Sequence, residues 1–155
     1  MAVFRPTPTR CERCVLPTSA ETLLLDTSAA MALVNPGHAH RQAVAKRVRG
    51  HRLGLAGHAA YETYSVLSRL PPPHRISAAA ARGLIEANFP ATRHLDPDQA
   101  SSALSVLATA GVAAGAVYDG LVALAALAAD QLLISCDQRA LTTYRAVGVR
   151  FEILS

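Results

Sequence analysis

The sequence predicts an α/β fold of three layers, α/β/α, with a mainly parallel sheet between the helices. The alternation of elements along the chain leads to this prediction, and the length and composition agree with it. Short apolar runs alternate with longer segments of helical periodicity. Such alternation is typical of parallel strands that are joined by helices on both faces of the sheet. The length of 155 residues suits one domain, and its core must be mainly Ala, Leu and Val because Trp is absent and other aromatics are few.

Residues 1–20 are expected to lie outside this domain. They are rich in Pro, Thr and Arg and show no periodicity, which indicates a disordered extension or a start assigned too early. The folded domain is therefore expected over 22–155. Cys11 and Cys14 form a lone Cys-x-x-Cys pair, which is half a zinc site at best, and two thiols in a flexible tail are the favoured interpretation.

The elements follow in order from their start and stop signals. The first helix ends at "NPG" (35–37), and the third ends before three consecutive prolines, 71–73. "DPDQ" (96–99) is a strong helix start, with Asp96 as N-cap and Pro97 at the first helical position. Strands are expected at 22–26, 52–56, 92–95, 131–136 and 149–154. Helices are expected at 28–34, up to about 49, 59–70, 77–88, 97–111, 119–129 and 138–146.

Composition narrows the class of protein. The longest apolar run, 121–129, is too short to span a bilayer, and the N-terminus lacks the apolar core of a secretory signal. A cytoplasmic protein with no membrane association is expected. The formal charge of +4 weakly favours an anionic partner such as nucleic acid.

Four acidic residues are not explained by ordinary surface or capping positions. Asp26 and Asp137 each end a predicted strand, and the carboxyl ends of parallel strands share the edge where open α/β folds bind ligands. Glu62 falls on the stripe Ala59, Glu62, Val66 and Leu70, which is expected to face the core.

Asp119 heads a helix that is apolar all round and therefore buried. About eleven helical residues descend roughly 16 Å, and the next strand climbs back a similar distance. Asp119 and Asp137 are therefore expected at the same end of the domain. Each acid alone could instead be a helix cap, a turn residue or half of an ion pair. Four such acids at one edge favour a shared site.

A site of four carboxylates requires cations. Two unit charges about 4 Å apart repel by about 4 kcal/mol at an effective dielectric of 20, so the four cannot all stay ionised alone. Oxygen ligands favour Mg²⁺ or Mn²⁺ over zinc. Such an ion assists phosphodiester hydrolysis by acidifying water and neutralising charge on phosphate. A basic stripe could hold a phosphate backbone near the site. Its members are Arg41, Lys46, Arg47, Arg49 and Arg52, and a solvated helix face is the alternative for each.

Four segments resemble a PIN domain, most closely the VapC-type toxins of bacterial toxin–antitoxin pairs. They are "LLLDTSAAMALV", "HAAYETYSVLSRL", "VYDGLVALAALAADQLLISCDQRAL" and "VGVRFEIL", and the resemblance covers about residues 22–154. It implies a metal-dependent endoribonuclease in which Asp26, Glu62, Asp119 and Asp137 bind Mg²⁺ or Mn²⁺ and support RNA cleavage. Ser28 and Ser135 match hydroxyl positions that orient those acids.

The resemblance also implies a homodimer, a VapB-type antitoxin and a tRNA or ribosomal RNA substrate. The extension 1–20 departs from the family. Two alternatives remain open at this point. One is a phosphohydrolase with Asp26 as nucleophile, although Ser28 stands where such enzymes carry a second aspartate. The other is a catalytically silent PIN-like module that only binds RNA or protein.

Overall fold

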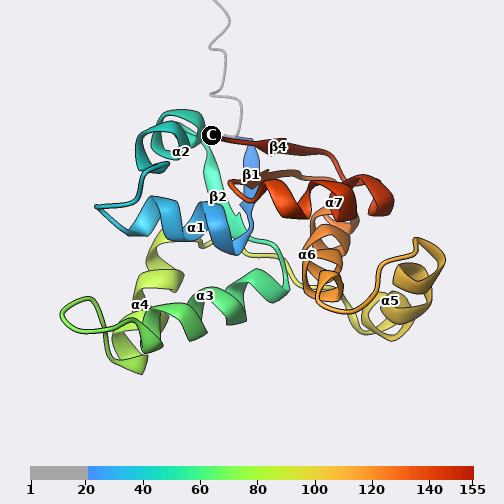
Figure 1. Ribbon diagram of the computed structural model, residues 1–155, viewed down its shortest axis with the longest axis horizontal. Coiled ribbons are helices and arrows are strands. Elements are labelled where there is room, and N and C mark those ends of the chain that lie inside the picture. Colours follow the sequence, from blue (N-terminus) through green and yellow to red (C-terminus); the bar gives the residue numbers. More distant parts are fainter. Residues whose placement is uncertain (1–20) are drawn as a thin grey trace, which may run out of the picture.

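A four-stranded parallel sheet forms the centre of the computed structural model, which describes residues 21–155 (Figure 1). The strand order is β2–β1–β3–β4. The strands are β1 (Thr22–Leu25), β2 (Arg52–Leu55), β3 (Leu132–Ser135) and β4 (Phe151–Ile153). All three pairings are parallel, which confirms the predicted class of sheet.

Seven α-helices and one 3₁₀ turn accompany these strands in the described part of the chain. They are α1 (Thr27–Val34), α2 (Arg41–Val48), α3 (His58–Arg69), α4 (Ala78–Asn88), α5 (Pro97–Thr109), α6 (Ala116–Ala128), η1 (Gln138–Ala140) and α7 (Leu141–Val147). The α/β fold is therefore as predicted. No helix among residues 21–155 has the length and hydropathy needed to cross a membrane.

The core is made of leucines in the strands and alanines in the helices. Leu23, Leu24 and Leu25 of β1 are completely buried, as expected for a central strand. Small side chains let α1 and α6 approach β3 closely, and both helices contact that strand. The alanines concerned are Ala29, Ala30 and Ala32 in α1 and Ala123, Ala125 and Ala126 in α6. The close packing fixes where the first residues of these helices lie.

Strand register brings two of the singled-out acids to one edge. Leu25 pairs with Ile134, so Asp26 and Asp137 both follow the carboxyl ends of adjacent strands. Asp26 extends the contact by donating its backbone N–H to the Ile134 carbonyl at 3.0 Å. This edge carries the candidate site.

The predicted strand at 92–95 is wrong. Only one isolated bridge forms, between Ala56 and Arg93. The Thr92 hydroxyl accepts the Leu55 N–H at 3.0 Å and so takes the place of a backbone acceptor. A Cβ on Gly54 would lie 2.2 Å from the Ala91 carbonyl oxygen, so glycine is required where this segment crosses β2.

Other element boundaries shift by a few residues. Helix α6 begins at Ala116 rather than at Asp119, which places Asp119 in its first turn. The segment predicted as one helix from 138 divides into η1 and α7. The start of α5 is as predicted, because Asp96 and Gln99 form a reciprocal capping box. The predictions for the extension and for Cys11 and Cys14 lie outside the described residues.

Candidate active site

All four singled-out acids line one cleft of about 210 Å³. Asp26 and Asp137 follow β1 and β3, while Glu62 and Asp119 come from α3 and α6. The rest of the lining is Thr27, Ser28, Met31, Val122 and Arg139. The topology thus brings together acids that are up to 111 positions apart in the sequence, between Asp26 and Asp137.

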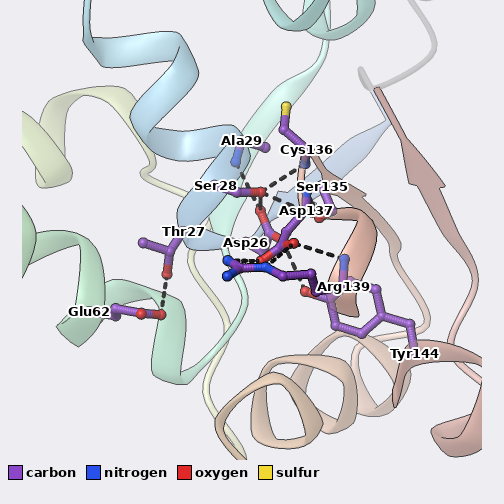
Figure 2. Close-up of polar contacts among 10 residues, drawn as sticks. All are labelled: Asp26, Thr27, Ser28, Ala29, Glu62, Ser135, Cys136, Asp137, Arg139 and Tyr144. Carbon is purple, nitrogen blue, oxygen red and sulfur yellow. Dashed lines mark hydrogen bonds and ion pairs between the residues drawn. The ribbon is translucent and has the colours of Figure 1, made fainter. Parts of the chain in front are cut away.

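Asp26 is the buried acid of the site, with only 5% of its surface exposed. It is the N-cap of α1, and its Oδ1 accepts the Ala29 N–H at 2.9 Å. Oδ1 also accepts the Ser28 hydroxyl at 2.7 Å, and Oδ2 accepts the Tyr144 hydroxyl at 2.9 Å (Figure 2). Burial raises the pKa of Asp26, and these hydrogen bonds oppose the rise. Asp26 is therefore both a helix cap and a member of the cluster.

The two serines connect the loops that carry the aspartates. Ser28 Oγ accepts the Cys136 N–H at 2.8 Å, and the two serine hydroxyls lie 3.4 Å apart. Ser135 Oγ accepts the Asp137 N–H at 2.9 Å. One short hydrogen-bonded chain thus runs from the Asp26 carboxylate to the Asp137 backbone.

Asp137 is held by Arg139, two positions further along the chain. Arg139 Nε and Nη2 donate to the two carboxylate oxygens at 3.0 and 2.8 Å, and its backbone N–H donates at 2.9 Å. Figure 2 shows the Arg139 side chain lying over Asp137. The hydrogen bonds from Arg139 lower the pKa of Asp137, although partial burial opposes this. The side chain of Arg139 is itself 91% exposed.

Asp119 is partly buried, and the negative charges of the other three acids repel its carboxylate. Burial raises its pKa first, and repulsion from Asp137, Asp26 and Glu62 raises it further. Arg139 acts in the opposite direction. The four carboxylates are therefore electrostatically one cluster.

Glu62 reaches the cleft, but not from the face that its spacing predicts. The buried stripe of α3 is Ala59, Thr63 and Leu67, whereas Glu62 is exposed. The prediction counted apolar residues only and so missed Thr63, which is completely buried. Glu62 Oε2 accepts the Thr27 hydroxyl at 2.7 Å, which ties α3 to the start of α1 (Figure 2).

Comparison with known proteins agrees with this arrangement. The model of the PIN domain family matches residues 23–146. Ribonuclease VapC40 of Mycobacterium tuberculosis is 40% identical over 133 residues, which cover 84% of this chain and 97% of VapC40. Ribonuclease VapC27 of the same organism is 39% identical over 131 residues, covering 84% and 96%.

The chain belongs to the PIN-domain family. The fold of this PIN domain is also similar to that in the crystal structure of VapBC2 from Rickettsia felis bound to a promoter DNA fragment. The TM-score is 0.62 at 11% identity, over 86% of this chain and 99% of the other. At that identity the likeness concerns the fold alone.

The donor atoms of this PIN domain suit a hard divalent cation. The cleft offers carboxylate and hydroxyl oxygens, and its lining includes no cysteine thiolate or imidazole. Burial and, after it, repulsion from the other three acids raise the pKa of Asp119, which is the direction that a bound cation would oppose. As arranged, however, no three acidic, His or Cys side chains among residues 21–155 are grouped to hold one ion. Arg139 engages both oxygens of Asp137 instead.

The basic stripe is divided by the fold of the PIN domain. Arg47 Nε is 2.7 Å from Glu152, and Arg41 donates to the Leu33 carbonyl. Lys46, Arg49 and Arg52 are exposed. Arg52 begins β2 and therefore lies at the opposite end of the sheet from Asp26. The prediction that the stripe lies near the site is wrong for Arg52.

Three side chains of the site were missed by reasoning from the sequence. Thr27 and Arg139 are each adjacent or nearly adjacent to a singled-out acid, so local spacing offered a signal for them. Tyr144 lies 118 positions from its partner Asp26, and no local pattern indicates that pairing.

Proposed function

We propose that this PIN domain is a metal-dependent endoribonuclease toxin that hydrolyses RNA phosphodiester bonds and is neutralised by a VapB-type antitoxin. The observation that carries the proposal is the convergence of Asp26, Glu62, Asp119 and Asp137 on one cleft. Two relatives at 39–40% identity bear the name ribonuclease VapC, which supports the reaction class. The net charge of +4 suits an anionic substrate.

Asp26, Asp119 and Asp137 are the residues proposed to hold Mg²⁺ or Mn²⁺, with Glu62 beside them. When bound, such an ion lowers the pKa of a water molecule and neutralises charge that develops on the phosphate. The chain's own part is to fix the acids. Ser28 and Tyr144 orient the Asp26 carboxylate, and Ser135 fixes the backbone of Asp137. Arg139 must leave Asp137 if that carboxylate is to take a metal ligand position.

Glu62 is proposed to act on the water side of the reaction. It is the exposed acid of the cluster, and Thr27 holds its Oε2. A solvent-accessible carboxylate at the edge of the cleft can reach a water molecule and accept a proton from it. Asp26 is unsuited to that role, because both of its oxygens already accept hydrogen bonds inside the protein.

Several further properties are proposed from the family relationship. They are a structured RNA substrate such as tRNA or ribosomal RNA, a homodimer, and action in the cytoplasm. The crystal structure from R. felis contains VapBC2, which supports a VapB-type partner for this chain. Lys46, Arg49 and Arg52 are proposed to contact phosphates distant from the cut, because Arg52 lies far from the acids.

The deciding experiment sequences the 5′ ends of RNA fragments produced by the wild type and by Asp119→Asn. We expect 5′-phosphate ends at defined positions, with Mg²⁺ or Mn²⁺ required and EDTA abolishing them. Asp119→Asn is the matched control because it keeps the size of the side chain. Cleavage that persists in EDTA or in Asp119→Asn would contradict the proposal. RNA binding without any cleavage would instead favour the silent-module alternative.

The phosphohydrolase alternative finds no support in the geometry. A nucleophilic aspartate needs a carboxylate oxygen that can reach substrate. Asp26 is buried, and its oxygens accept hydrogen bonds from Ala29, Ser28 and Tyr144. We therefore place Asp26 in the ligand set and not in covalent catalysis.

A further inference from the structure

Four aromatic and imidazole rings gather beside the acidic cleft, and we name them the ring patch: His58, Tyr61, His94 and Tyr118. His58 stacks on Tyr118 with ring centroids 5.0 Å apart and planes at 23°. Tyr61 lies 5.6 Å from His94 and 6.4 Å from His58. The rings come from α3, from the segment before α5, and from α6. The contacts make them one surface although they are scattered in the sequence.

Three of the four rings, those of Tyr61, His94 and Tyr118, are exposed, and His58 is half-buried. Tyr61 is 65% exposed and Tyr118 is 56% exposed. Tyr61, His58 and His94 border a cleft of about 230 Å³, whose other lining residues are Gly57, Leu95 and Leu121. Burying an aromatic ring is strongly favourable, so rings left exposed in an ordered group indicate a surface that binds something.

A local backbone feature produces this surface. Gly57 has a φ of +49°, and a Cβ there would lie 2.8 Å from the Ala125 Cβ in α6. Glycine therefore lets the start of α3 lie against α6, and Figure 1 shows the two helices side by side at this point. The result is that His58 reaches Tyr118.

The ring patch adjoins the acids directly. Tyr61 precedes Glu62 on α3, and Tyr118 precedes Asp119 on α6. Successive helical residues differ by 1.5 Å in height and by about 100° around the axis. Each tyrosine therefore projects from the same turn as an acid of the cleft but toward the neighbouring surface.

We propose that the ring patch stacks the bases of single-stranded RNA next to the bond that is cut. The inference rests on the proposed function and adds to it that the substrate is unpaired at the site. Stacking on aromatic side chains is the usual way for proteins to hold unpaired bases. The lining of the 230 Å³ cleft contains two imidazoles and no carboxylate, and the exposed Arg93 precedes His94. The Arg93 guanidinium and the absence of carboxylates from this lining suit a nucleic acid.

A second copy of the chain is the competing occupant of this surface. Aliphatic side chains, which suit such contacts, are exposed elsewhere: Leu104 and Val106 on α5 and Leu127 at the end of α6. The tyrosine hydroxyls and imidazoles of the ring patch favour bases, which offer a flat face and polar edges.

The experiment measures RNA affinity in full-length chains that carry Asp26→Asn, so that binding is read without cleavage. The probe is a fluorescein-labelled, single-stranded 12-nucleotide RNA of mixed sequence, compared with its duplex. Tyr61→Ala and Tyr118→Ala are each expected to weaken single-strand binding roughly 5- to 150-fold, equivalent to the 1–3 kcal/mol of one stacked base. Tyr61→Phe and Tyr118→Phe keep the ring and should bind within about twofold of the parent.

Tyr64→Ala is the matched control. Tyr64 lies on the same helix and is 39% exposed, but it takes part in none of the ring contacts of the patch. It should leave affinity unchanged. As an independent readout, RNA containing 5-iodouridine should crosslink under light to Tyr61 or Tyr118. Circular dichroism of each variant checks that the fold is intact.

The outcomes separate the two proposals. Unchanged RNA affinity in both alanine variants, while the wild type cleaves RNA, overturns the stacking inference alone. Alanine variants that convert a dimer to a monomer in sedimentation, with RNA affinity intact, assign the patch to a second copy and also overturn it. Ring-dependent binding and crosslinking in a chain that never cleaves RNA supports stacking and overturns the proposed reaction.

Discussion

Asp26 and Asp137 end adjacent strands at the same edge of the sheet, yet the protein holds them in opposite ways. Asp26 is buried, accepts hydrogen bonds from one backbone N–H and two hydroxyls, and has a raised pKa. Asp137 is more exposed and is paired with the exposed side chain of Arg139. The hydrogen bonds from Arg139 lower the pKa of Asp137.

The difference shows how one site combines fixed and adjustable ligands. Neutral hydroxyl donors orient the Asp26 carboxylate but do not neutralise its charge. A cation bound beside it would therefore stabilise the ionised form. Arg139 cancels the charge of Asp137 but is 91% exposed, and such a pair is weak and easily exchanged. Asp26 is therefore already positioned to bind a metal ion, whereas Asp137 would become available when the Arg139 side chain moves away.

The largest expected effect follows from removing the fixed ligand. Asp26→Asn keeps the shape and the cap of α1 but removes the charge that draws a cation. We expect RNA cleavage to fall on the order of 100- to 1,000-fold, as when one preorganised electrostatic group is lost from an active site. Single-turnover cleavage in Mn²⁺ measures it. Near-normal activity would show that Asp26 is only a cap.

Tyr144→Phe tests how the fixed side is supported. It removes the hydroxyl that donates to Asp26 Oδ2 inside the protein. We expect the free energy of unfolding to fall by about 1–3 kcal/mol, because a buried acceptor loses its partner. Urea denaturation measures the change, and Tyr61→Phe on the exposed surface is the control. An unchanged midpoint would contradict the role given to Tyr144.

The two aspartates should also give opposite dependence of stability on pH. Because the pKa of Asp26 is higher in the folded state than its ordinary value of 3.8, the protonated carboxyl favours folding. This contribution to stability is complete below pH 3.8 and is lost as the pH rises through the folded pKa. Asp26→Asn does not titrate, so without metal it should be more stable than the wild type at neutral pH. The advantage should disappear below pH 3.8. Thermal unfolding in EDTA across this range checks the sign.

Arg139→Gln tests the adjustable side of the comparison between Asp26 and Asp137, and its expected effect is the smallest of the four. The lowered pKa of Asp137 contributes stability above its ordinary value of 3.8, which is lost as pH falls through the folded pKa. Removing Arg139 should cost little stability, because the pair is exposed. Mn²⁺ should bind several-fold more tightly, since Asp137 no longer exchanges one cation for another. Calorimetry of Mn²⁺ binding tests this, with Arg145→Gln as control, and weaker binding would contradict it.

Features set by local signals could be predicted from the sequence. The Asp96 capping box and the apolar strands follow from patterns a few residues long. The shared edge of Asp26 and Asp137 followed from the rule that parallel strands end on the same side, and the position of Asp119 followed from the lengths of one helix and one strand. Glu62 was expected at the site from a buried stripe that the structure does not show. Features set by tertiary contact could not be predicted. The failed strand at 92–95 depends on a side-chain hydroxyl replacing a backbone acceptor, and the buried Thr63 on α3 breaks the simple apolar stripe.

The hydrogen bond between Tyr144 and Asp26 spans 118 positions of the chain. During translation at about 5–20 residues per second, Asp26 is made roughly 6 to 24 s before Tyr144. Until then Asp26 lacks helix α7, which carries Tyr144. Strand β3, which ends at Ser135, is also made long after Asp26. A nascent chain in which Tyr144 has not yet been made therefore cannot assemble the complete pocket. RNA cleavage of the proposed kind would therefore begin only after the segment from Ser135 to Tyr144 has been made and has packed against Asp26.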